Sequence, residues 1–147
     1  MTLAIRPVRP DDHAAWQPLW AGYQRFYATA IPDATSALTW QRFLDPAEPM
    51  HAALAWRGDR AVGLVHHIFH RSCWTRGDYC YLQDLFVAED ARGEGAGAAL
   101  IQHVYAAAEA AGASRVHWLT HETNDSAMQL YDRLAERSGF LQYRHLL

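Results

Sequence analysis

The sequence predicts one domain of the α/β or α+β class, spanning residues 1–147, with a mixed and mostly antiparallel sheet of about six to seven strands flanked by about four helices. Three observations support this. The chain has 147 residues, of which 50% are apolar, enough for one core. The first half alternates apolar and polar residues around short turns, which is typical of antiparallel hairpins. The second half alternates strand-like and helix-like segments, which indicates crossover connections.

The first half is expected to contain two helices and the beginning of the sheet. A strand at residues 4–8 precedes a helix at 14–28, whose aromatic residues repeat at helical spacing and form one face. A shorter helix at 36–44 ends before the Asp45-Pro46 pair. Strands at 50–56 and 61–70 flank the turn Arg57-Gly58-Asp59-Arg60 and predict a hairpin.

The second half is expected to complete the sheet. Another hairpin turns near residues 75–78 and leads into a strand at 80–87, a glycine-rich turn and a helix that ends at Ala111. A strand at 115–120 follows. Asn124-Asp125-Ser126 can cap the next helix, which carries Met128, Leu130, Tyr131 and Leu134, and a last strand is expected at residues 140–145.

Composition excludes several classes of function. A formal charge of −3 and a pI near 6.3 give no overall attraction to nucleic acids or acidic membranes, so neither is an expected partner. All 13 basic residues are arginine, which excludes a P-loop lysine, a pyridoxal-phosphate Schiff base and a lysine nucleophile. The N-terminus has no apolar signal region and no long apolar run occurs, so we expect a cytoplasmic protein with Cys73 and Cys80 as free thiols.

The segment from Tyr81 to Leu100 carries the main functional signal. An apolar strand runs into a turn with glycines at 93, 95 and 97 and then into a helix, so backbone N–H groups and the helix dipole can meet a phosphate. The turn fits the dinucleotide fingerprint G-x-G-x-x-G/A by letter, but the strand at 115–120 lacks the acid that this fold requires. A purely structural turn is the other alternative, although Arg92 adds a guanidinium that such a turn does not need.

The run Arg92-Gly93-Glu94-Gly95-Ala96-Gly97 resembles the Arg/Gln-x-x-Gly-x-Gly/Ala signature of the GCN5-related N-acetyltransferase (GNAT) family. The strand YLQDLFV, the alanine-rich helix, the strand ending in WLTHETN and the helix NDSAMQLYDRLAERSGF follow the order of that family, so the resemblance covers nearly the whole chain. It is strongest for the branch that acetylates small amines, polyamines, histones and D-amino acids. The resemblance implies a GNAT-like fold and an acetyl-CoA-dependent N-acetyltransferase.

The resemblance also implies where acetyl-CoA binds. The backbone of Leu85, Phe86 and Val87 would pair with the pantetheine arm like an added strand, and a backbone amide near Phe86 or Val87 would polarise the thioester carbonyl. Asn124 and Tyr131 would flank the thioester end, and Ala127 is also expected to contact the cofactor. The expected pyrophosphate-binding residues are those of the glycine turn: Arg92, Gly93, Glu94, Gly95, Ala96, Gly97 and Ala98.

Three residues are candidates for catalysis. By resemblance, Tyr131 is the general acid that protonates the departing thiolate. Gln83 stands where polyamine acetyltransferases carry a glutamate base, and an amide cannot accept a proton at neutral pH. Asp84 is a candidate base if a bulge redirects it, because regular strand alternation would place it on the face opposite to Tyr81 and Gln83.

The leading hypothesis for the base is a water chain to Glu122, His121, His66 or His67, since histidine exchanges protons near neutral pH. Residues expected to contact a small-molecule or peptide amine are Tyr23, Phe26, Tyr27, His66, Trp74, His121 and Glu122. No metal site is expected from His66, His67 and His70, because neighbours on a strand face opposite ways and no acid or cysteine completes a ligand set.

Two functions from different classes stay open on sequence alone. The favoured function is acetyl transfer to a primary amine by direct attack, with no acyl-enzyme, because no cysteine is close in sequence to the glycine turn or Tyr131. The alternative is a non-catalytic acyl-CoA-binding or regulatory module that has lost its base at Gln83. The resemblance also implies a homodimer.

Overall fold

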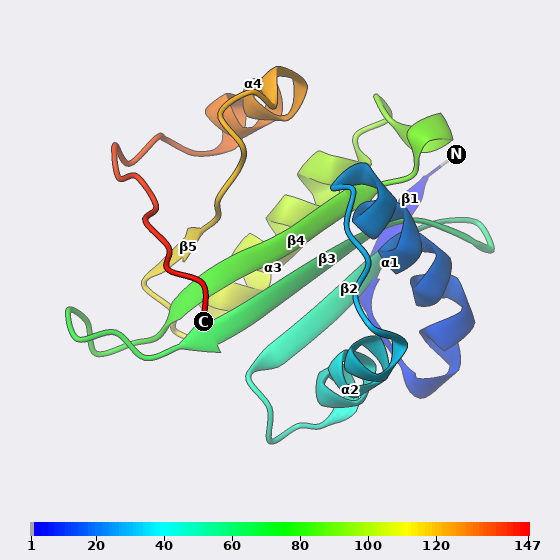
Figure 1. Cartoon of the computed structure of the whole chain (residues 1–147), viewed down its shortest axis with the longest axis horizontal. Coiled ribbons are helices and arrows are strands. Elements are labelled where there is room, and N and C mark those ends of the chain that lie inside the picture. Colours follow the sequence, from blue (N-terminus) through cyan, green and yellow to red (C-terminus); the bar gives the residue numbers. More distant parts are fainter. Residues whose placement is uncertain (1) are drawn as a thin grey trace.

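The computed structural model describes residues 2–147, which form one α/β domain built around a five-stranded sheet (Figure 1). In chain order the strands and helices are β1 (Leu3–Pro7), η1 (Pro10–Asp12), α1 (His13–Phe26), α2 (Asp33–Leu44), β2 (Met50–Arg57), β3 (Arg60–His70), β4 (Tyr79–Val87), η2 (Glu89–Ala91), α3 (Ala96–Ala110), β5 (Arg115–His117) and α4 (Asp125–Leu134). The predicted fold class, the helix number and the order of the elements up to α4 are therefore confirmed.

The sheet has the strand order β1-β2-β3-β4-β5, so consecutive strands are neighbours throughout. The first three pairings are antiparallel and the β4–β5 pairing is parallel, which makes the sheet mixed. The β2–β3 hairpin turns at residues 57–60, as the Arg-Gly-Asp-Arg sequence predicts. Helix α3 provides the crossover between the parallel strands β4 and β5.

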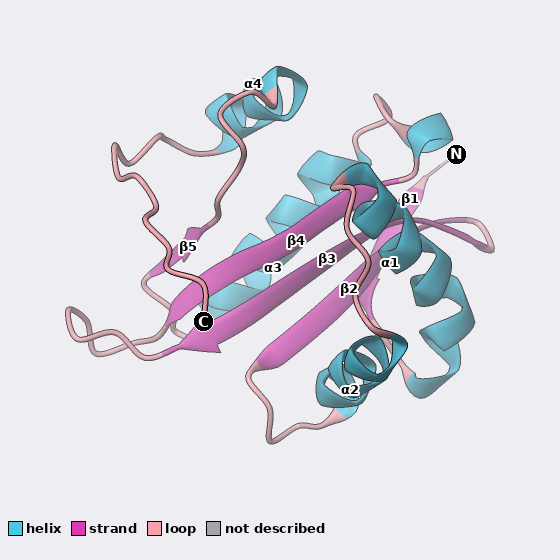
Figure 2. Cartoon of the chain, in the orientation of Figure 1, coloured by secondary structure: helices cyan, strands magenta, loops and turns pink. Residues whose placement is uncertain are grey.

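Helices cover both faces of the sheet, and each face has its own core (Figure 2). On one face α1 and α2 pack through tryptophans against β2 and β3; the buried residues there are Trp16, Leu19, Trp20, Trp40, Leu54, Trp56 and Leu64. On the other face α3 packs through aliphatic side chains; the buried residues there include Val62, Val65, Leu82, Leu100, Ile101 and Val104. Helix α4 lies beyond the edge of the sheet that β5 forms.

The expected count of six to seven strands is wrong, because residues 140–145 do not form a strand. Strand β5 is also shorter than expected and ends at His117. It pairs with β4 over only three residues, which leaves little edge on which a further strand can add. The side chains of Phe140, Leu141 and Tyr143 are accordingly exposed. The boundaries of the first two helices differ slightly from those predicted: α1 ends at Phe26 instead of residue 28, and α2 begins at Asp33 instead of residue 36.

None of the helices within residues 2–147 combines the length and the apolar character needed to cross a membrane. Cys73 is exposed, Cys80 is buried, and both are free thiols, as expected. The thiol of Cys80 has a pKa raised to about 11 by burial, which keeps it protonated and unreactive at neutral pH.

Candidate functional site

A cleft of about 580 Å³ opens where β4 and β5 separate. The two strands pair only from Tyr79 to Tyr81 on β4, so the backbone edge of β4 beyond Tyr81 has no strand partner on this side. The end of β4 forms one wall, the glycine turn and the start of α3 form the floor, and α4 forms the opposite wall. The sheet therefore leaves a slot into which an extended ligand can add as a strand.

The residues that line the cleft include most of those expected to hold the cofactor. They are Leu85, Phe86, Val87, Arg92, Gly93, Gly95, Ala96, Gly97, Ala98, Asn124, Ala127 and Tyr131. Phe26, Ala91, Ser126, Leu130 and Arg133 complete the lining. Glu94 does not line the cleft, because its carboxylate accepts a hydrogen bond from Arg57 at the β2–β3 turn. Only the backbone of Glu94 stays in the glycine turn.

The glycine turn has the backbone shape of an anion cradle. Gly93 and Gly95 have φ of +80° and +90°, which other L-residues rarely adopt, and an added Cβ would meet no heavy atom within 4 Å at either position. Gly95 is the N-cap of α3, so the first N–H groups of this 15-residue helix open onto the same space. Gly97 serves packing instead, since a Cβ there would lie 3.2 Å from Leu130 of α4. Open space above exposed amides fits a pyrophosphate.

Arg92 lies at the mouth of the cleft with its charge uncompensated by acids. Its Nε donates a hydrogen bond of 3.1 Å to the Val87 carbonyl, and its guanidinium carbon is 5.6 Å from the Phe26 ring centre and 5.7 Å from that of Phe86. No ion pair within residues 2–147 involves Arg92. The guanidinium is therefore available to an anion.

A β-bulge at Gln83 decides which way Asp84 faces. Strand β3 pairs His66 with Asp84 and His67 with Leu82, so Gln83 is an extra residue without a partner. Before the bulge Leu82 packs on the α3 side, and after it Leu85 does so. Asp84 consequently shares the α1 side with Tyr81. The bulge is thus the condition under which Asp84 could serve as the base.

Asp84 belongs to a buried chain of hydrogen bonds that links α1 to the sheet. One carboxylate oxygen accepts a bond of 2.7 Å from the Tyr23 hydroxyl, and the other lies 2.8 Å from Nδ1 of His66. The Trp16 indole N–H, which can only donate, lies 3.0 Å from Nε2 of His66. Nε2 must therefore accept, so the Nδ1–H form of His66 donates to Asp84. His66 is 2% exposed and orients the carboxylate rather than reaching a ligand.

Three tyrosines surround this carboxylate and stay protonated. Burial raises the pKa of Tyr23, and the charge and hydrogen bond of Asp84 raise it further. Burial and Asp84 also raise the pKa of Tyr27 and of Tyr81. Tyr27 packs against Tyr23 with ring centres 4.9 Å apart. Together the negative carboxylate and the aromatic rings form surroundings that attract an ammonium group.

Tyr131 reaches the cleft from α4. Its ring contacts that of Trp118 edge to face, with centres 5.4 Å apart. Burial raises the pKa of Tyr131, and Tyr27 raises it further. A raised pKa keeps the hydroxyl protonated and able to donate. Tyr27 interacts electrostatically with both Tyr131 and Asp84, so it lies near both the candidate acid and the candidate base.

Of the other expected acceptor-binding residues, Trp74 lies apart from this site, and His121 and Glu122 do not line the cleft. Trp74 is 83% exposed on the β3–β4 turn, at the end of β4 opposite to the glycine turn. His121 and Glu122 are exposed on the loop before α4, and His121 bonds to Thr123. His66 and His67 face opposite sides of the sheet, as expected, and no group of three potential metal ligands occurs within residues 2–147.

Sequence reasoning missed Trp16 as a partner of the site. Trp16 and His66 are 50 residues apart in the chain, and no local pattern distinguishes this indole from the other tryptophans of α1 and α2. Phe26 was expected to contact the acceptor only, whereas it also lines the cleft between β4 and α4 that holds the residues expected to bind the cofactor.

Comparison with known proteins agrees with this geometry. The model of the acetyltransferase (GNAT) family matches residues 16–135. The D-amino-acid N-acetyltransferase HPA3 of Saccharomyces cerevisiae is 34% identical over 145 residues, which cover 97% of this chain and 89% of that protein.

Solved structures share the fold at low sequence identity. The structure of AAC(6')-Iy in complex with a bisubstrate analogue of CoA has a TM-score of 0.87 at 16% identity and covers 100% of this chain and 99% of that one. Ribosomal-protein-alanine N-acetyltransferase from Brucella melitensis biovar Abortus 2308 has a TM-score of 0.79 at 22% identity, covering 99% of this chain and 100% of that one.

Proposed function

The chain belongs to the GNAT family of acetyltransferases and is an N-acetyltransferase, and from this premise we propose that it acetylates the primary amine of a small molecule at the inner end of the β4–β5 cleft. The observation that carries the proposal is the position of Asp84. The Gln83 bulge places this carboxylate on the face that holds Tyr23, next to the strand segment 85–87 that lines the cofactor cleft.

Acetyl-CoA fits the cleft by the shape and chemistry of its lining. GNAT proteins use acetyl-CoA, which supplies an acetyl group as a thioester. We propose that the N–H groups of the glycine turn and Arg92 hold its pyrophosphate, and that the free edge of β4 at 85–87 holds its pantetheine arm. Asn124 and Ala127 of the facing wall would orient the thioester end.

In this proposal two side chains handle protons. Asp84 accepts a proton from the ammonium group of the acceptor, so that the free amine can attack, and Gln83 takes no part. The Tyr23 hydroxyl and the His66 N–H hold the carboxylate in a single orientation. The Tyr131 hydroxyl donates the proton that the leaving thiolate requires, and its raised pKa keeps that proton available at neutral pH.

The acceptor is proposed to be a small amine rather than a large cationic polymer. Tyr23 and Tyr27 present aromatic rings beside Asp84, and this combination binds an ammonium by charge and by cation–π attraction. HPA3 acts on D-amino acids, as its name states, and D-amino acids are therefore the first acceptors to test. The homodimer and the cytoplasmic location expected from sequence stay proposals of the same kind.

The decisive test is a panel of amines with acetyl-CoA, followed by thiol release. The panel pairs D- and L-forms of several amino acids and adds polyamines, an aminoglycoside and a lysine peptide. We expect turnover of at least one amine, and loss of turnover in Tyr131→Phe. Tight CoA binding without turnover of any panel member would support the non-catalytic acyl-CoA-binding module instead.

A further inference from the structure

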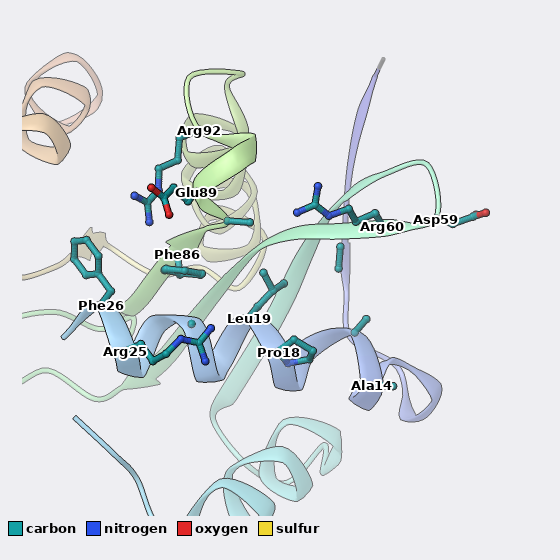
Figure 3. A pocket seen from close by; sticks show the side chains of 14 residues that line it. Ala14, Pro18, Leu19, Arg25, Phe26, Asp59, Arg60, Phe86, Glu89 and Arg92 are labelled. Carbon is teal, nitrogen blue, oxygen red and sulfur yellow. The ribbon is translucent and has the colours of Figure 1, made fainter. Parts of the chain in front are cut away.

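A second cleft, of about 870 Å³, lies on the other side of the wall formed by Phe26, Phe86 and Arg92 (Figure 3). Helix α1 forms one side of it, and the start of β3 together with η2 forms the other. The proposed reaction uses neither this space nor the face of α1 that borders it. The two clefts share only those three residues.

The charges around the second cleft leave a positive excess. Arg60 is neutralised, because its guanidinium makes two hydrogen bonds to Asp90, of 2.8 and 2.7 Å. The side chain of Asp59 points away from the other labelled residues in Figure 3. Arg25, Arg92 and Glu89 remain, and none of them forms an ion pair within residues 2–147. Two guanidiniums therefore stand against one carboxylate.

Arg92 lies over the Phe86 ring, and Arg25 lies close to Gly22, whose backbone packs against the same ring. A Cβ built on Gly22 would lie 2.9 Å from Cε2 of Phe86 and 3.7 Å from Nη2 of Arg25, so the ring and this guanidinium both lie beside Gly22. The Arg92 guanidinium carbon is 5.7 Å from the centre of the same ring. An anionic group placed at this ring could therefore be reached by both arginines.

The rest of the second cleft is apolar. Small or apolar residues of α1 border it, together with two alanines that flank the β3 start and η2; they are Ala14, Ala15, Pro18, Leu19, Ala61 and Ala88. From residue 14 to residue 25 the helix rises by about 16 Å, at roughly 1.5 Å per residue. The cleft is thus an elongated, largely apolar trough with Arg25 and Arg92 at one end.

We propose that this trough binds a small organic carboxylate with an apolar body. The carboxylate would lie between Arg25 and Arg92, and the body would extend along α1 toward Ala14. Because Arg92 also faces the cofactor cleft, a ligand here draws on a guanidinium that the pyrophosphate needs. Binding at the two clefts is therefore negatively coupled, and the carboxylate raises the KM for acetyl-CoA.

The binding test uses 4-phenylbutyrate as the probe and 4-phenylbutyramide as its uncharged match, with affinity measured by ligand-observed NMR on the full chain without cofactor. Arg25→Gln removes one guanidinium, and Arg42→Gln is the matched control, because Arg42 is an equally exposed helical arginine on α2. We expect saturable binding of the acid to the wild type. The dissociation constant should be at least about tenfold higher for the amide with the wild type and for the acid with Arg25→Gln. It should stay unchanged for the acid with Arg42→Gln.

A second variant tests the location. Ala14→Trp places a large side chain in the trough from an exposed position and should abolish probe binding while leaving the thermal unfolding midpoint nearly unchanged. Absence of saturable binding to the wild type, or equal affinity in Arg25→Gln and Arg42→Gln, would overturn the site. If the probe binds but leaves the KM for acetyl-CoA unchanged, the coupling through Arg92 is refuted.

Discussion

The Tyr23 hydroxyl and the Asp84 carboxylate are joined by a hydrogen bond of 2.7 Å that ties helix α1 to strand β4. The bond crosses from the aromatic layer under α1 to the strand that borders the cofactor cleft. It gives Asp84 a fixed orientation, and the same helix supplies the rings beside it. The proposed acceptor site is consequently part of the packing of the domain and not a loop added to it.

Asp84→Asn is expected to lower kcat by about 10²-fold or more, because an amide cannot take the proton of the acceptor ammonium. Steady-state kinetics with the best acceptor from the panel measure this effect. Gln83→Ala is the control, since the bulge residue is exposed and has no partner on β3, and its kcat should stay within a few-fold of wild type. A kcat for Asp84→Asn close to that of wild type would exclude Asp84 as the base.

Tyr131→Phe is expected to lower kcat by about 10²-fold while the dissociation constant for CoA changes little, because only the hydroxyl proton is lost. The ring keeps its contact with Trp118, so the fold and the cleft should persist. Calorimetric titration with CoA separates binding from turnover. Loss of CoA binding equal to the loss of kcat would assign Tyr131 a packing role instead.

His66→Leu is expected to destabilise the fold by about 1–3 kcal/mol for each buried group left without a partner, namely the Trp16 N–H and one Asp84 oxygen. Urea denaturation measures the change. His70→Leu is the control, because His70 is exposed at the end of β3 and bonds only to the neighbouring carbonyl of Arg71. Equal stability of the two variants would show that the buried chain contributes nothing.

Gly95→Ala is expected to raise the KM for acetyl-CoA, since a Cβ would occupy the open space over the cradle and φ of +90° strains any side chain by about 1–2 kcal/mol. Gly139→Ala carries the same kind of strain, at φ of +86° in the C-terminal segment, and has the same open surroundings. The control should lose stability without any change in KM. A similar KM for both variants would separate the cradle from cofactor binding.

Stability is expected to fall as the pH drops below about 6.5, because burial lowers the pKa of His67 to about 3 and also lowers those of His51 and His103. A pKa lower in the folded state means that the unfolded chain binds the proton first, so acid favours unfolding. For His67 alone, the free energy of unfolding falls by up to about 1.4 kcal/mol for each unit by which the pH drops. Urea denaturation at pH 7, 6 and 5 should show that the free energy of unfolding depends less steeply on pH in His67→Leu than in the wild type. An equally steep dependence in both proteins would contradict this role of His67.

The cofactor cleft was predictable from sequence, because its lining comes from local patterns. A glycine-rich turn between a strand and a helix favours an anion-binding backbone, and residues 85–98 form the strand end, turn and helix start that their order predicts. The orientation of Asp84 was not predictable. A bulge is specified by pairing with β3, and Tyr23 and His66, the hydrogen-bond partners of Asp84, lie 61 and 18 positions away in the chain.

The C-terminal segment was predicted as a strand from its local pattern, and this prediction was wrong. Its alternating residues suit a strand, but a strand needs a neighbour, and the short β5 does not offer an edge long enough. Local pattern alone could not supply that information. The second cleft was likewise invisible in the sequence, because Arg25, Arg60 and Arg92 come from three separate elements.

Gln83 affects this site because it adds one residue to β4, and not through its side chain. Its amide has no role in the proposed chemistry, yet the presence of one additional residue turns Asp84 toward α1. Other residues can therefore replace Gln83, provided that the number of residues in β4 stays the same. In an alignment of related sequences, position 83 is expected to vary in residue type but to contain no deletions.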